Sequence, residues 1–342
     1  MTTTLRSAQG GLSGPSRVEK RRRLVSARDL PDMLFRGYAW STGIIVVAIM
    51  IAVGVFLALR AGQALQVAGW SFFTEQVWEP DAGRFGIVAV LFGTLLIALI
   101  AGVVSVPLAV GTALFISEVA SGRFQRTLIS LVDLMAAVPS VVFGLWGVFF
   151  LTAEVIPVSR WLATWFGWFP LFRVDGFDPT DPLAGANLFT SSPLIAGLVV
   201  AFMVVPIQTS VMREAFSQAP AGEREGAYAL GATRWGMITA VVLPFGKGGM
   251  IGGTMLGLGR ALGETIAVYM IISPVFEVQW QPLHTNGNSV SALIANRYGE
   301  ASPIGLSALM AAGLALFLIT LVVNFTASTI VSRSRSGAES EV

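Results

Sequence analysis

Two charged residues, Arg260 and Glu264, stand four positions apart in an apolar, glycine-rich segment of this 342-residue chain. Residues four apart on a helix share one face. A charge inside a membrane helix costs roughly 2.5–3.5 kcal/mol on insertion scales, so each one needs a reason. Two interpretations stay open. The residues form a buried ion pair that locks helix packing, or the donor fork of Arg260 contacts a tetrahedral oxyanion that Glu264 keeps from binding too tightly.

Three glycines share the predicted face of this charge pair. At about 100° per residue, Gly249, Gly253, Gly257, Arg260 and Glu264 fall within roughly an 80° sector of one helix. The glycines form two overlapping small-xxx-small patterns, which let helices pack backbone to backbone. We therefore expect the glycines to form a helix-packing surface, and the charge pair to face the protein interior rather than lipid.

The residue types and motifs of the chain exclude most kinds of enzyme chemistry. The chain has no cysteine and one histidine, His284, which rules out thiolate and His-cluster metal sites. His284 stands in a predicted polar outer loop, so we expect no Ser/His/Asp set around it. A nucleotide-binding loop is missing too, because Gly248 follows Lys247 where Ser or Thr is needed. We expect a protein that is not an enzyme, with no catalytic residue, metal site or bound cofactor. Any ATP and Mg²⁺ would be used by a separate polypeptide.

Long apolar segments must position these residues. Of the chain, 54% is hydrophobic and only 12% charged, about half the charged fraction of a soluble domain. A membrane span needs roughly 20 predominantly apolar residues. The sequence therefore predicts an all-α integral membrane protein with six transmembrane helices, at about 38–59, 85–117, 128–150, 193–212, 249–272 and 303–331.

The basic residues orient these helices. An even number of spans puts both termini on one side, and sixteen of the 22 Lys and Arg residues fall on that side. Positive charge accumulates in cytoplasmic segments, so we expect both termini of this multi-pass protein to be cytoplasmic. The predicted parts are a disordered basic tail at 1–35, a membrane domain at 36–331 and a C-terminal tail at 332–342.

The cytoplasmic segment 217–244 carries the most informative motif. It predicts a short helix with charged residues at its start, small residues along one face and a glycine at its C-terminal cap. Small residues allow a second protein to approach the backbone closely. The residues expected to make this contact are Glu225, Gly226, Ala227, Gly231 and Ala232.

This pattern, which runs through to Leu243-Pro244, resembles the EAA loop of ABC-importer permeases. In that family a short coupling helix docks on a cytoplasmic ATPase. Gly226 stands where alanine is usual, and this variant is typical of the phosphate-import branch. The segments 72–78, 139–147 and 259–265 also resemble that branch. The resemblance covers nearly everything after the N-terminal tail and implies the type I ABC-importer permease fold.

The resemblance also implies function and partners. It implies the transmembrane subunit of an ATP-driven phosphate importer, which forms half of the translocation pathway and in which the Arg260/Glu264 pair is associated with transport. The implied partners are a second homologous permease, two ATP-binding subunits and an extracytoplasmic phosphate-binding protein. The alternatives are an importer of another oxyanion, such as sulfate or molybdate, and a secondary transporter or channel.

Overall fold

The computed structural model describes residues 30–181 and 185–335. Most of the predicted tails, 1–35 and 332–342, lies outside the described residues. The first helix, α1 (Leu30–Ala68), begins earlier than predicted. The chain divides within this helix into two units, 1–52 and 53–342.

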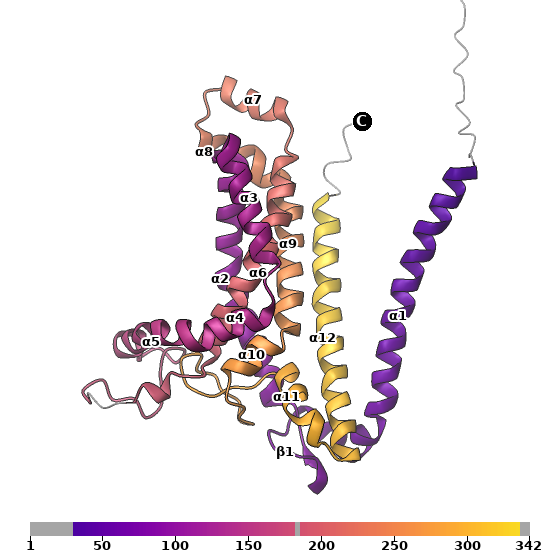
Figure 1. The fold of residues 1–342 in the computed structure, drawn as a ribbon, viewed down its shortest axis with the longest axis vertical. Helices are drawn as coiled ribbons and strands as arrows, with labels where there is room; N and C mark the ends of the chain where they lie inside the picture. Colours follow the sequence, from indigo (N-terminus) through magenta and orange to yellow (C-terminus); the bar gives the residue numbers. More distant parts are fainter. Residues whose placement is uncertain (1–29, 182–184, 336–342) are drawn as a thin grey trace, which may run out of the picture. The chain divides into compact units, whose positions relative to one another are not determined.

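The described chain is mostly helical, in agreement with the predicted fold class (Figure 1). After α1 the α-helices are α2 (Val88–Leu114), α3 (Gly122–Ala136), α4 (Ser140–Trp146), α5 (Thr152–Phe166), α6 (Pro193–Ser217), α7 (Ala221–Ala229), α8 (Arg234–Met237), α9 (Leu243–Gly263), α10 (Ile266–Ile271), α11 (Val290–Arg297) and α12 (Pro303–Arg335). Wider π turns are η3 (Phe115–Val119), η4 (Gly147–Leu151) and η6 (Ile238–Val242). Tighter 3₁₀ turns are η1 (Gly69–Phe73), η2 (Pro80–Ala82), η5 (Ala186–Leu188) and η7 (Tyr298–Glu300). One antiparallel hairpin joins β1 (Trp78–Glu79) to β2 (Arg84–Phe85), with Trp78 opposite Phe85.

Six helical segments of the described residues are long and apolar enough to cross a membrane, which confirms the predicted number. They are Asp32–Phe73, Val88–Val119, Ser140–Phe166, Pro193–Ser217, Arg234–Gly263 and Pro303–Thr326. Two predicted extents were wrong. The run 128–150 is broken between α3 and α4, because Pro139 disfavours the helical conformation of the residue before it. The run 249–272 is broken between α9 and α10.

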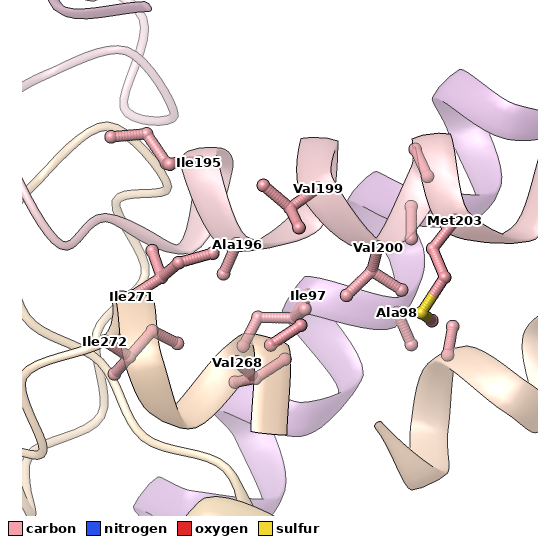
Figure 2. Close-up of a cluster of buried hydrophobic side chains, with 14 of the residues drawn as sticks. Ile97, Ala98, Ile195, Ala196, Val199, Val200, Met203, Val268, Ile271 and Ile272 are labelled. Carbon is pink, nitrogen blue, oxygen red and sulfur yellow. The ribbon is translucent and has the colours of Figure 1, made fainter. Parts of the chain in front are cut away.

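The helices α2, α3, α6 and α9 run alongside one another, whereas α5 runs across them (Figure 1). A large buried core joins α2, α6 and α10. Its centre contains small and β-branched side chains, which allow the helices to approach closely; Figure 2 shows Ile97 and Ala98 of α2, Ala196, Val199, Val200 and Met203 of α6, and Val268 and Ile271 of α10. This core holds α10 beside α6, and it fixes where the segment after Gly263 must turn.

Candidate functional site

The helix α9 packs against α6 through its glycines. A β-carbon added at Gly249 would lie 2.0 Å from the β-carbon of Ala215, and one added at Gly257 would lie 2.0 Å from Nε2 of Gln208. Gly253 is buried between them. Both separations are far below van der Waals contact. Only glycine fits at Gly249, because the Ala215 β-carbon cannot move away, whereas at Gly257 the flexible Gln208 side chain would have to shift. The predicted glycine face therefore lies against a neighbouring helix at backbone-to-backbone distance.

The charge pair is arranged differently from the prediction. The helix α9 ends at Gly263, and Glu264 has an extended backbone with φ −68° and ψ 124°. Arg260 and Glu264 are therefore not on successive turns of one helix, and none of the ion pairs among the described residues joins them. The helix breaks at a glycine, where its continuation is weakly favoured. Glu264 instead accepts a hydrogen bond, 3.2 Å long, from the Ala267 N–H at the start of α10.

The two charged residues also differ in burial. Glu264 is buried, and its main-chain carbonyl accepts a 2.7 Å hydrogen bond from the Ser291 hydroxyl. Arg260 is exposed in this chain, contrary to the expectation that the pair would face the interior. The prediction treated the segment as one straight helix, and the break at Gly263 sends the two side chains into different surroundings.

Arg260 lines a groove of about 610 Å³ between α6, α9 and α12. Most of the lining is apolar, including Ile207 of α6, Leu256 of α9 and Leu316 and Phe317 of α12; the polar residues in it are Arg260, Thr320 and Asn324. Within the described part of the chain, Arg260 is the only charged residue of this groove. None of the ion pairs among the described residues involves Arg260, and an unpaired arginine on a membrane-spanning segment calls for a partner.

The predicted coupling helix is α7, and Gly231 ends it. Gly231 has a left-handed backbone (φ +84°). Its N–H bonds the Tyr228 carbonyl at 2.9 Å, and the Ala232 N–H bonds the Ala227 carbonyl at 3.0 Å. This is the Schellman arrangement, which satisfies carbonyls at the end of a helix. Thr233 then caps α8 by accepting a hydrogen bond from the Gly236 N–H, so the turn between the two short helices is tightly defined.

We expect Gly231→Ala to destabilise this turn by about 1–2 kcal/mol, because a β-carbon is unfavourable in left-handed backbone. The matched control is Gly222→Ala on α7, where a β-carbon would meet nothing within 4 Å. Limited proteolysis of the purified protein should show faster cleavage near residue 231 in the first variant and unchanged or slower cleavage in the second. Equal cleavage of both variants would contradict the expectation.

The coupling segment has one anchored face and one exposed face. Ala227 packs against a buried cluster that joins the ends of α2, α6, α8 and η6: Ala109, Ala113, Met212, Phe216, Ala219, Met237, Ile238 and Val242. On the other face Glu225 and Gly226 are exposed, and Leu230 is 91% exposed at the tip of the turn. Tyr228 and Trp235 of the two short helices are exposed as well.

Sequence reasoning missed the contacts that Arg224 makes from this segment to two other helices. Arg224, counted in the sequence only as a basic residue, forms an ion pair with Glu118 of η3, 3.2 Å between Nη1 and Oε2. It also donates a 2.6 Å hydrogen bond from Nη2 to the Phe216 carbonyl of α6. Arg224 and Glu118 are 106 positions apart, and nothing in their local sequence pairs them.

A polar contact joins the loop after α5 to the loop after α10. The side-chain amide of Gln281 donates a 3.0 Å hydrogen bond to Asp175. This bond, with the Arg173 guanidinium beside it, lowers the pKa of Asp175 from its usual value. The carboxylate therefore stays charged to lower pH and fixes the segment after α5 against the segment after α10.

Comparison with known proteins identifies the class. Residues 105–336 match the family of binding-protein-dependent transport system inner membrane components. Two solved structures share the fold: a bacterial ABC transporter involved in import of the acidic polysaccharide alginate (TM-score 0.53, 19% identity, covering 89% of this chain and 96% of that one) and the MetNI methionine ABC transporter (TM-score 0.51, 15% identity, covering 72% and 95%). The chain belongs to this family of membrane transport subunits and has the fold of an ABC-importer permease.

Relatives with higher sequence identity all belong to one kind of transport system. The chain is 36% identical to the phosphate transport system permease protein PstC 2 of Mycobacterium tuberculosis, over 90% of this chain and 93% of that protein. It is 38% identical to PstC of Pasteurella multocida, over 85% and 89%. It is 40% identical to PstC of Mycobacterium leprae, over 81% and 85%. These relatives confirm the resemblance that the coupling segment suggested.

Proposed function

We propose that this chain is the permease subunit of an ATP-driven importer of inorganic phosphate and forms half of its translocation pathway. The observation that carries the proposal is 36–40% identity to PstC proteins over most of both chains. The exposed guanidinium of Arg260 supports it, because a planar donor fork matches the geometry of a phosphate oxyanion. Glu264 enters the proposal as the residue that positions α10 after the break that follows Arg260.

A second, homologous permease (PstA-like) is the partner that fits the groove of Arg260. The groove is lined by three spanning helices and presents apolar side chains around one cation. A similar subunit facing it would cover the apolar lining and leave Arg260 at a shared central passage. Phosphate binding there must be weak enough for release, as in any transport pathway.

The exposed face of α7 is the proposed contact with one of two ATP-binding subunits (PstB-like), which would bind the ATP and Mg²⁺.

In Figure 1, α7, α8 and the C-terminal end of α12 lie at the same end of the 53–342 unit. With the excess of basic residues on that side, this supports a cytoplasmic C-terminus, and an even number of spans extends the assignment to the N-terminus. An extracytoplasmic phosphate-binding protein (PstS-like) would dock at the opposite end. The chain would then reside in the bacterial plasma (inner) membrane.

The proposed cycle follows from these contacts. ATP binding would draw the coupling segments of the two permeases together and turn the pathway outward to accept phosphate. Hydrolysis and release would reset it. The chain itself carries out no covalent chemistry, and its contribution is to join the ATPase contact at α7 to the helices that line the groove.

Phosphate uptake in cells that lack this chain tests the proposal. Adding back the wild-type chain should restore uptake of labelled phosphate, and excess sulfate or molybdate should not compete. Competition by either anion would favour another oxyanion importer. Phosphate transport by the purified chain alone in liposomes, without an ATPase, would establish the secondary-transporter alternative.

The Glu225→Gln variant tests the ATPase contact. Removing the charge from an interface pair weakens binding by several kcal/mol when the pair is buried on association. We therefore expect about a tenfold or greater loss of ATPase subunit that co-purifies with the chain, and a matching loss of uptake. Glu214→Gln, at an exposed position near the end of α6, is the control. Full ATPase retention by Glu225→Gln would argue against this contact.

A further inference from the structure

One side chain joins the coupling helix to two membrane-spanning helices. Arg224 of α7 reaches Glu118, in the π turn η3 that ends α2, and the Phe216 carbonyl in the last turn of α6. The two contacts use different nitrogens of one guanidinium. A rigid fork can hold two acceptors in fixed positions relative to each other, which a lysine ammonium cannot do in the same way.

The pair is shielded from water. The side chain of Glu118 is 3% exposed and that of Arg224 is 23% exposed. A surface ion pair contributes little, but loss of one partner of a buried pair leaves an uncompensated charge at large cost. The contact should therefore persist when α7 is displaced, so that η3 and the end of α6 move with α7.

The same contact continues to the helix that carries Arg260. Phe216 is fully buried, and its ring fills the space above Gly246 of α9, where an added β-carbon would lie 2.4 Å from the ring. A displacement of the Phe216 backbone therefore pushes directly on α9. One route of contacts thus runs from Arg224 through Phe216 to α9, and α9 lines the groove.

We propose that Arg224 is the positioning residue that couples movement of α7 to α2, α6 and α9, and thereby links the ATPase to the groove. This inference rests on the proposed function. The location of Glu118 in a π turn agrees with it, because π-helical segments are inserted distortions that occur frequently at functional sites. Arg224 differs in role from Glu225, which is exposed and faces the ATPase: Arg224 points back into its own chain.

The test uses the full complex in liposomes, with its partner permease, ATPase subunits and phosphate-binding protein. Three quantities are measured: the ATPase subunits retained, the ratio of ATP hydrolysis with and without phosphate-loaded binding protein, and the phosphate imported per ATP hydrolysed. The variants are Arg224→Met, Arg224→Lys and Glu118→Gln. The control is Arg123→Met, which removes an exposed arginine from the first turn of α3.

Arg224→Met should retain its ATPase subunits, while the stimulation ratio falls close to one and phosphate imported per ATP falls about tenfold. Arg224→Lys and Glu118→Gln each keep part of the contact and should give intermediate values. The double variant Glu118→Gln, Arg224→Met should be no worse than Arg224→Met alone, because both changes remove the same link. Arg123→Met should match the wild type.

Wild-type stimulation and stoichiometry in Arg224→Met would overturn the inference. Loss of the ATPase subunits from that variant would also overturn it, because Arg224 would then serve docking. If Arg224→Met fails to accumulate in the membrane, the test rests on Arg224→Lys and Glu118→Gln. A wild-type stimulation ratio and wild-type phosphate import per ATP in both variants would then reject the proposal. Failure of the proposed function itself would appear separately, as absence of phosphate import by the wild-type complex.

Discussion

Replacement of Arg260 by glutamine is expected to abolish phosphate uptake while the complex stays assembled. Glutamine keeps a donor but loses the charge and the planar fork. A hydrogen bond to a charged group contributes roughly 1.5–3 kcal/mol, so removing one such bond to phosphate corresponds to about a ten- to hundredfold change in binding. Because Arg260 is the only charge in the described lining of the groove, no neighbouring side chain can take its place.

Two further variants sharpen this experiment. Arg260→Lys keeps the charge without the fork and should retain partial uptake. Arg84→Gln removes an exposed arginine whose pair with Glu75 lies on the surface, so uptake should be unchanged. Membrane abundance and co-purified partner subunits must be measured in parallel. Normal uptake by an assembled Arg260→Gln complex would remove Arg260 from the pathway.

The second large effect is expected at Gly249. Alanine there would place its β-carbon 2.0 Å from that of Ala215, and a β-carbon cannot rotate away. The α6–α9 packing must therefore separate, which we expect to cost about 1–3 kcal/mol, the usual range for an overpacked core. Thermal unfolding of the purified protein in detergent should show a lower midpoint.

Gly252 provides the matched control on the same helix. A β-carbon at Gly252 would meet nothing within 4 Å, and alanine is favoured over glycine in a helix by up to about 1 kcal/mol. Gly252→Ala should therefore leave the midpoint unchanged or raise it. A similar drop in both variants would mean that general helix properties, rather than the contact with Ala215, control the stability of this segment.

The number of spans was predictable because length and hydropathy are properties of local sequence. Hydropathy alone did not predict the breaks, because it treats the apolar runs around Pro139 and Gly263 as continuous. Pro139 is itself a local signal for the first break, whereas the break at Gly263 depends on distant residues. An apolar segment can contain a turn wherever another part of the chain makes hydrogen bonds to the backbone groups that the turn leaves unpaired. After Gly263 the hydroxyl of Ser291 donates to the Glu264 carbonyl, and sequence pattern alone does not place Ser291 nearby.

The candidate site shows the same limit. The glycine spacing predicted close packing because small-xxx-small patterns act through the geometry of a single helix. The surroundings of Arg260 depend on where α12 lies, and the Arg224 contact depends on Glu118, 106 positions away. Both depend on the tertiary structure. The resemblance of the coupling segment identified the family without them, because that motif is local.

The broken helix at Gly263 has a consequence for how mutations in this region should be understood. Hydrocarbon offers no water to backbone groups, so a helix that stops at membrane depth leaves peptide groups that the protein must satisfy itself. Glu264 satisfies one with its carboxyl group, and its own carbonyl is satisfied by Ser291. A carboxyl group in this place therefore repairs a gap in the main chain. Genetic screens that score growth on phosphate would place positions 260 and 264 in one class, although under the proposed function a change at 260 would remove cargo recognition and a change at 264 would disturb the local fold.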